Sequence, residues 1–410
     1  MGFFLSSKNK VRYGALIDIG SGSVLTAIVA SDSQKSHPDI IWSTREYAPL
    51  RKTTKVSDSA KGVMTSLMNA LMALDGEGRK ALYEATNQHK IHHLQVTVAA
   101  PWSYTATKTI SYQNEEAFEV TDTLIAELLR TAEQKVTEEM QEQEQVHELG
   151  LTIVARTTMQ VIANGYPIRV TNKQKAETVK VIEANAVVQK YLVDAVADAR
   201  DKILPEASLS QYSFVLPYYF VLVDLIPDVN EFCIVDITYE ATEIGIVRDG
   251  ILTYTTHTPY GAFSLARELA EVLSVPLEEA YGYLSCEDLN CFITNTSEAK
   301  REEIEQILAA YRTKLSELFT ETGDSLAIPK KIYLHANFST EEFFSSQILA
   351  AAAMATRMQH ATYNVTHELL TKHYDEEGKK ALLGQNGDTA LLISAQFFHT
   401  KEHHMKFEQL

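Results

Sequence analysis

The residues with the clearest chemical potential lie in one short segment, 15–24. An apolar run ends at the carboxylate of Asp18, and Gly20, Ser21, Gly22 and Ser23 follow before a second apolar run begins. Backbone N–H groups and hydroxyls in such a turn can surround a phosphate, and a carboxylate beside it can hold a hydrated Mg²⁺. The same composition is common in ordinary turns, so the segment alone predicts only a hairpin.

A second segment repeats this design about half a chain later. An apolar run, 232–237, contains Asp236 near its end, a polar turn with Thr238 follows, and another apolar run starts at Thr242. Two such hairpins predict a duplicated fold whose two lobes face one ligand. Asp18 and Asp236 are then the candidate metal residues, with a simple turn-capping role as the alternative for each.

Composition narrows the classes of function. The chain has 410 residues, enough for two or three domains, and a net charge of −17. This charge argues against binding to nucleic acid or to an anionic membrane surface. The three cysteines are too few for a disulfide framework, and we expect a reducing cytosol. Apolar runs are too short for a transmembrane helix, which needs roughly 18 residues.

The elements that must position the two turns can be predicted from periodicity. Apolar spacing predicts helices at 59–74, 121–136, 176–203, 263–273, 277–289 and 299–319. Residues 102–175 are typical of a small α+β unit, in which Asn164 and Gly165 predict a hairpin turn.

Two motifs and the order of elements resemble the actin-like ATPase superfamily. The motifs are Asp18-Ile-Gly-Ser-Gly-Ser-Val and Asp236-Ile-Thr-Tyr-Glu-Ala-Thr-Glu-Ile-Gly-Ile. The unit that follows Val96-Thr-Val-Ala-Ala-Pro matches the place where the bacterial proteins FtsA and PilM carry a small insert. The chain therefore resembles the FtsA/PilM branch, which takes part in cell division and type IV pilus assembly.

This resemblance implies an α/β fold, a duplicated actin-like (ribonuclease H-like) two-lobe fold with a small α+β insertion in the first lobe. The first lobe would begin with residues 1–95 and return with a helix in 176–212. The insert would span 96–175. The second lobe would span 213–410, with a helical subdomain at about 264–325.

The family contacts its nucleotide through two phosphate turns and an adenosine motif. The second phosphate turn and the adenosine motif of this chain depart from the family pattern. Thr238, Tyr239 and Glu240 stand where the family's second phosphate turn is rich in glycine, and their side chains crowd and repel a phosphate. The adenosine motif, expected at 331–339, contains Asn337 and no glycine. Asn337 and Gly261, which ends a strand, complete the candidate cofactor-binding residues, and no catalytic residue is assigned.

Two functions follow from this pattern. The first is a cytoplasmic scaffold or adaptor at the inner membrane, which organises a pilus or division assembly and has weakened or lost ATP turnover. The alternative is an active ATPase, in which ATP and Mg²⁺ bridge the lobes and drive polymerisation or a conformational switch. The small insert disfavours a third class, the sugar or acetate kinases.

The resemblance also implies the kind of partner. We expect protein partners of a membrane-associated assembly, self-association into filaments, and no nucleic acid. Residues 397–410 are too polar for an amphipathic anchor, so membrane contact would be indirect or through the apolar tip at residues 3–5.

Overall fold

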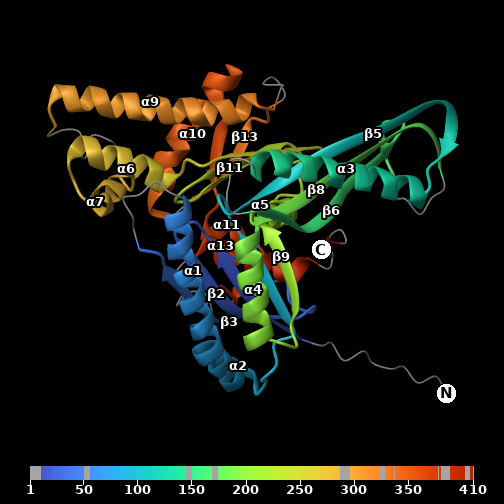
Figure 1. Ribbon diagram of the computed structural model, residues 1–410, viewed down its shortest axis with the longest axis horizontal. Coiled ribbons are helices and arrows are strands. Elements are labelled where there is room, and N and C mark those ends of the chain that lie inside the picture. The colour runs from blue at the N-terminus through green and yellow to red at the C-terminus, as the bar shows by residue number, and fades with distance from the viewer. Residues whose placement is uncertain are drawn as a thin grey trace.

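The computed structural model describes residues 11–49, 56–144, 150–168, 174–286, 296–322, 328–336, 338–376, 378–379, 388–401 and 407–409. Two sheets with the same strand order form two lobes, and a third sheet forms an insert that projects from between them (Figure 1).

The first lobe is built on a sheet with the order β3-β2-β1-β4-β9. Its strands are β1 (Arg12–Ile19), β2 (Ser23–Ser31), β3 (Asp39–Tyr47), β4 (His93–Val98) and β9 (Ser208–Ser213). The first three strands are antiparallel neighbours, whereas β4 and β9 run parallel to β1. The tight turn between β1 and β2 is the predicted first hairpin.

Helices cover both faces of this sheet. They are α1 (Val56–Ala73), η1 (Leu74–Gly78), α2 (Arg79–Thr86), α4 (Lys190–Ile203), α5 (Val215–Leu225) and α13 (Thr389–Thr400). Side chains alternate between the faces of a strand. Ile17 of β1 therefore packs in the main core with Leu67 of α1, while Leu16 packs against Leu391 of α13. The last described helix thus returns to the first lobe.

The second lobe repeats the order of the first, β12-β11-β10-β13-β14. Its strands are β10 (Phe232–Ile237), β11 (Thr242–Arg248), β12 (Ile251–Thr258), β13 (Lys331–His335) and β14 (Ala361–Asn364). Its other elements are α6 (Ala262–Leu273), α7 (Leu277–Tyr283), α9 (Glu298–Thr320), η3 (Phe338–Thr340), α10 (Glu341–Thr356) and α11 (His367–Leu370). The predicted duplication and the α/β class are confirmed.

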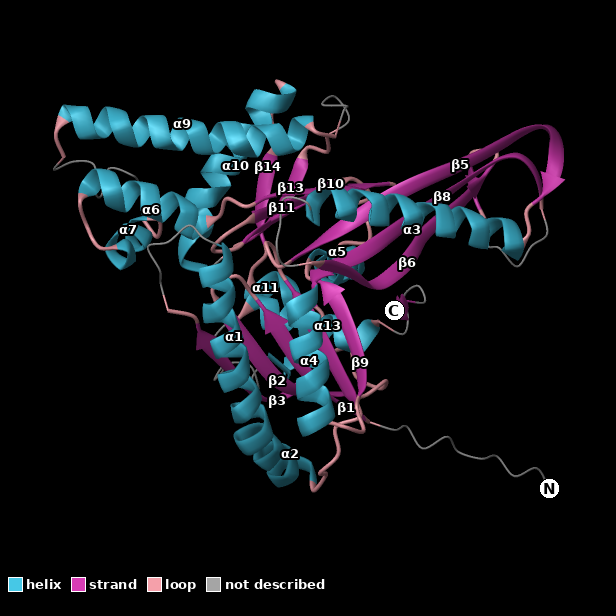
Figure 2. Ribbon diagram, in the orientation of Figure 1, coloured by secondary structure: helices cyan, strands magenta, loops and turns pink. Residues whose placement is uncertain are grey.

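The insert is a sheet with the order β15-β6-β8-β5, covered by α3 (Asp122–Glu144). Its strands are β5 (Ser103–Glu119), β6 (Leu151–Ala163), β7 (Tyr166–Pro167), β8 (Lys175–Gln189) and β15 (Phe407–Gln409). In Figure 2 its long strands extend from the junction of the two lobes. Asn164 and Gly165 turn β6 into β7 with positive φ of 49° and 82°, as the predicted hairpin requires.

One helix prediction was wrong. Residues 175–189 form strand β8, and the helix predicted at 176–203 is confined to α4, Lys190–Ile203. Val179 and Ile182 match a helical spacing, but Val179 and Val181 lie in the same cluster beneath α3, as alternation along a strand requires. The β-branched residues fit the pleated surface between β5 and β6. The helix predicted at 277–289 is also shorter, because α7 ends at Tyr283.

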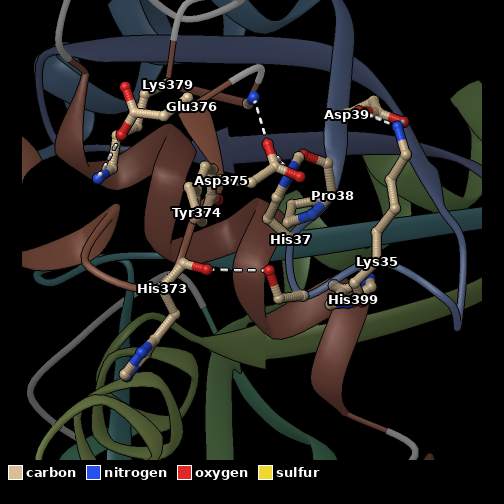
Figure 3. A network of polar contacts seen from close by, with 12 residues as sticks. Lys35, His37, Pro38, Asp39, His373, Tyr374, Asp375, Glu376, Lys379 and His399 are labelled. Carbon is tan, nitrogen blue, oxygen red and sulfur yellow. Dashed lines mark hydrogen bonds and ion pairs between the residues drawn. The ribbon is translucent and has the colours of Figure 1, made fainter.

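Polar contacts attach the segment after α11 to the first lobe, as Figure 3 shows. The buried ring of His37, between β2 and β3, stacks on Tyr374 with centroids 4.6 Å apart. His37 Nε2 lies 3.2 Å from Asp375 Oδ1, and Ser36 Oγ donates to the carbonyl of His373 at 2.9 Å. These contacts bring the chain back from the second lobe before α13.

Two further findings concern membrane spans and the oxidation state of the cysteines. In the ranges given above, no helix combines the length and the apolarity needed to cross a bilayer. Cys233 is free and buried, whereas Cys286 is disulfide-bonded, a bond that the cysteine count did not lead us to expect.

Candidate functional site

The two predicted turns border one cavity of about 580 Å³ between the lobes. Both candidate metal residues, Asp18 and Asp236, line it. Further lining groups come from β3, β13, α7, α11 and the start of α13: Arg45, Tyr47, His335, Tyr281, His367, Asp388 and Thr389. The duplicated hairpins therefore do face a shared cleft.

Asp18 lies at the end of β1 and is only 3% exposed. Thr97 Oγ1, from the neighbouring β4, donates to Asp18 Oδ1 at 2.8 Å. Burial raises the pKa of the Asp18 carboxyl to about 6, although the guanidinium of Arg45 opposes this shift. The nearest guanidinium nitrogen of Arg45 lies 3.9 Å from Asp18 Oδ2.

Arg45 on β3 joins this carboxylate to two other groups. Its Nε lies 2.7 Å from Asp388 Oδ2, and its Nη1 donates to Ser23 Oγ at 2.6 Å. Asp388 also caps α13, because its Oδ1 accepts the N–H of Leu391 at 3.0 Å. The chain's own cation thus occupies the space beside Asp18.

Asp236 has a comparable internal partner. His335, at the end of β13, places Nδ1 2.7 Å from Asp236 Oδ1, and its Nε2 lies 3.0 Å from Thr389 Oγ1. Burial by itself lowers the pKa of His335, but the hydrogen bond and charge of Asp236 raise it above the ordinary value. His335 therefore joins the second lobe to the start of α13 on the first.

The two turns touch each other directly. The ring of Tyr239, in the second turn, lies on Gly22 of the first, where an added Cβ would be 2.3 Å from Tyr239 Cδ2. The N–H of Glu240 donates to Ser21 Oγ at 3.1 Å, and Thr238 Oγ1 donates to the carbonyl of Ala100 at 3.0 Å. The glycine that was expected to let a phosphate approach instead accommodates an aromatic ring.

The predicted cofactor-binding residues divide into three groups. Gly20, Ser21, Ser23 and Thr238 line the cavity with the two aspartates. Three others contact protein atoms instead. Gly22 lies against the ring of Tyr239, and Gly261 lies against the backbone of the second turn. Thr242 Oγ1 donates to the carbonyl of Tyr260 at 2.9 Å. Asn337 lies outside the described residues. As nucleotide ligands, all ten stay predictions.

Arg45 was not identified from the sequence as a residue of the site. Arg45 and Asp388 are 343 residues apart, so no local pattern pairs them. An Asp before an apolar helix was the one available signal, and it predicts a cap rather than an ion pair. The side chain of Glu240, whose charge was expected to repel a phosphate, forms a two-point ion pair with Arg267 of α6.

A magnesium ion does not fit these residues well. Asp18 and Asp236 each face a positive or protonatable side chain of the chain itself. Within the described ranges, no group of three or more His, Cys, Asp or Glu side chains is placed to hold a metal ion.

Glu243, which follows Thr242 on β11, is buried behind the cleft and is 1% exposed. Burial raises the pKa of its carboxyl to about 8, although the N–H of Thr105, which donates to Oε1 at 3.1 Å, opposes this. Oε2 has no hydrogen-bond partner in the described part of the protein. Glu243 is thus protonated in the folded chain near neutral pH and ionised when unfolded.

This difference predicts a pH dependence of stability. Because folding takes up a proton at Glu243, the free energy of unfolding should fall as pH rises from about 4.5 to about 8. Glu243→Gln removes this titration, so its stability relative to wild type should rise by up to about 2.7 kcal/mol between pH 6 and pH 8. Urea midpoints at both pH values measure the change, with Glu303→Gln on the exposed side of α9 as control. Parallel pH profiles for wild type and Glu243→Gln would contradict the assignment.

Comparison with known proteins gives a likeness in structure only. No protein-family model matches the chain, and no curated protein matches it. A solved structure titled PilM-PilN type IV pilus biogenesis complex is 13% identical, with 95% of this chain and 99% of that chain covered and a TM-score of 0.55. The ethanolamine utilization protein EutJ from Carboxydothermus hydrogenoformans is also 13% identical, with 94% and 89% covered and a TM-score of 0.43.

A Bacteroides thetaiotaomicron protein described as having an actin-like ATPase fold and unknown function is 9% identical, with 94% of this chain and 100% of that chain covered and a TM-score of 0.38. The likeness to the first of these structures extends over nearly the whole chain, which here contains two lobes of the same sheet order. The chain therefore has the two-lobe fold of the actin-like ATPases.

Proposed function

We propose that this protein is a scaffold that binds other proteins, and that ATP turnover in its cleft is lost. The contact between Tyr239 and Gly22 carries this proposal. A nucleotide held by both turns needs its phosphates between them, where backbone N–H groups can reach the oxygens. Here a phenol ring and the bond from Glu240 to Ser21 take that space.

The charges of the cleft support the same conclusion. Arg45 and His335 lie beside the two aspartates that would hold a hydrated metal ion, and Arg45 is itself fixed by Asp388. A divalent cation arriving at Asp18 would meet a guanidinium at short range, which is repulsive in a buried site. Metal-assisted phosphoryl transfer would therefore require these ion pairs to open first.

The likeness to the PilM-PilN complex suggests the kind of assembly. That structure is described as a type IV pilus biogenesis complex, and the likeness in fold covers nearly the whole length of each chain. We propose a comparable role here: an adaptor on the cytoplasmic side of the inner membrane that contacts protein partners of a pilus or division assembly. The outer part of the insert, which projects away from the lobes in Figure 1, would present the partner surface, and self-association into filaments would add further contacts.

An ATP-binding function is the second candidate, because one observation favours it. The cavity beside the turns is about 580 Å³, within the usual range for ligand sites, and both aspartates line it. A movement of Tyr239 away from Gly22 would uncover that glycine beside a cavity that Gly20, Ser21 and Ser23 already line.

Nucleotide binding distinguishes the two functions. We expect the melting temperature of the purified chain to stay unchanged in millimolar ATP, with or without Mg²⁺, because the turns are in contact. A ligand present at 100 times its Kd raises the free energy of unfolding by about 2.7 kcal/mol, which a thermal scan detects readily. A clear rise that requires Mg²⁺, together with phosphate release, would favour the ATPase instead. Mg²⁺ alone is the control for ionic effects.

A further inference from the structure

One residue at the base of the insert, Thr105 on β5, is bonded by both lobes. Its N–H donates to Glu243 Oε1 at 3.1 Å, and its carbonyl accepts from Thr255 Oγ1. These two partners lie on β11 and β12 of the second lobe. Thr105 Oγ1 is 2.7 Å from the Oγ of Ser213 on β9 of the first lobe. The base of the insert is therefore a junction of three parts of the molecule.

The junction is shielded from water. Thr105 is 2% exposed, Glu243 is 1% exposed and Ser213 is fully buried. Beside them the ring of Tyr104 stacks on His257 of β12, with centroids 5.1 Å apart and planes 16° apart. Hydrogen bonds in such a setting are strengthened by the low local dielectric, and losing one leaves a buried polar group unpaired.

The strand that bonds Thr105 also carries the second turn of the cleft. β11 begins at Thr242, directly after the turn that places Tyr239 on Gly22, and Glu243 is its second residue. In the antiparallel pair of β10 and β11, Glu243 stands directly opposite Asp236. A displacement of this turn must therefore displace the group that holds the insert.

We propose that Thr105 is a mechanical joint through which movement between the two lobes is transmitted to the insert. Chain connectivity alone predicts the opposite, because the insert leaves and re-enters the first lobe, where the N–H of Gln189 donates to the carbonyl of Trp102 at 2.9 Å. The hydrogen bonds of Glu243 and Thr255 to Thr105 attach the insert sheet directly to the second lobe as well. The coupling holds whether or not the cleft binds nucleotide.

Two neighbouring residues of β12 provide a matched pair for the test. Thr255 bonds the carbonyl of Thr105, whereas the hydroxyl of Thr256 bonds the carboxylate of Glu321 within the second lobe. Both are replaced by valine, which keeps the shape and removes the hydroxyl. Hydrogen exchange in the full chain is followed by mass spectrometry in peptides that cover the base of β5 and the turn at 238–241.

Thr255→Val should raise exchange at the base of β5 and at the turn, each by about fivefold or more, the factor that corresponds to roughly 1 kcal/mol. Thr256→Val should change neither segment. In the reverse direction, Tyr239→Ala removes the ring from Gly22 and should raise exchange at the base of β5 by a similar factor. Combining Tyr239→Ala with Thr255→Val should raise exchange at β5 by less than the product of the single effects, because both changes weaken the bonds of the second lobe to the same residue, Thr105.

The proposal is overturned if Tyr239→Ala raises exchange at the turn while the base of β5 stays at its wild-type rate. It is equally overturned if Thr255→Val and Thr256→Val behave alike. Should Tyr239→Ala fail to fold, Ser21→Ala removes only the acceptor of the Glu240 N–H and serves as the variant that loosens the cleft. The same two readouts then decide the question.

Discussion

Arg45→Ala should destabilise the first lobe by about 3–5 kcal/mol, the usual cost of removing one partner of a buried ion pair. The guanidinium is mostly buried, with 20% of its side chain exposed, and it lies between Asp18, Asp388 and the hydroxyl of Ser23. Without it, two carboxylates remain in a site of low dielectric with no strong cation near them. The two tryptophans of the chain, Trp42 and Trp102, pack in the core of the first lobe and report its unfolding in urea.

The pH dependence of the destabilisation by Arg45→Ala distinguishes the loss of its charge from the loss of its packing contacts. Arg45 lowers the pKa of Asp18, so its removal should raise that pKa further above its present value of about 6. A carboxyl whose pKa is raised by folding binds a proton in the folded state and gains stability as pH falls. The defect of Arg45→Ala should therefore be smaller at pH 5 than at pH 7.5. A defect that is equal at both values would point to packing alone.

Two further variants control this experiment. Asp388→Asn in the Arg45→Ala background should recover part of the loss, because it removes one unpaired charge while an asparagine still caps α13. Lys90→Ala, which breaks an exposed pair with Glu206 on the same lobe, should leave the urea midpoint unchanged. If the double variant is less stable than Arg45→Ala, the ion pairs are not what holds this part of the cleft.

The features that sequence predicted correctly are local ones. Asp18 and Asp236 each end an apolar strand before a polar turn, and this pattern depends on neighbouring residues alone. The structure places both beside one cavity, as the duplication predicted. The hairpin at Asn164 and Gly165 was predictable for the same reason, since a turn with positive φ at two positions selects those residues.

The features that sequence missed depend on distant parts of the chain. Arg45 meets Asp388 only because α13 returns to the first lobe, and His335 meets Thr389 only because β13 ends beside that helix. The sequence indicated that Tyr239 crowds its own turn, but not that the ring would lie on Gly22 of the other lobe. Strand β8 was mistaken for a helix because its partners β5 and β6 are separated from it in sequence.

The side chains that contact Gly22, Asp18 and Asp236 have one physical effect in common. Three groups that a nucleotide complex would leave for phosphate or metal lie against side chains of the protein: a ring covers Gly22, a guanidinium lies near Asp18, and an imidazole bonds one oxygen of Asp236. The other oxygen of Asp236, Oδ2, has no hydrogen-bond partner among the described residues. Buried polar groups are costly without partners, so a cleft that has lost its ligand is stabilised by replacing it with side chains. The proposed scaffold role accounts for all three replacements together.

The second large effect is expected at Gly261, which supports the turn that carries Tyr239. A Cβ at Gly261 would lie 2.4 Å from the carbonyl oxygen of Thr238 and 2.5 Å from the nitrogen of Ala241. These are backbone atoms, which cannot rotate away as a side chain can. The same turn is fixed to α6 by the N–H of Phe263, which donates to the carbonyl of Tyr239 at 2.7 Å. Gly261→Ala should therefore cost on the order of 3 kcal/mol, at the upper end for overpacking.

Gly282→Ala is the matched control, because a Cβ at Gly282 meets nothing within 4 Å and the residue lies in helix α7. Alanine is a better helix former than glycine, so this variant should gain up to about 1 kcal/mol. Calorimetry of the two variants should therefore give shifts of opposite sign. Hydrogen exchange at 238–241 should also rise in Gly261→Ala alone, since the turn must move to admit the methyl group and carries Tyr239 away from Gly22. If Gly261→Ala is as stable as wild type, the turn can move freely, and the contact that closes the cleft is weaker than its geometry implies.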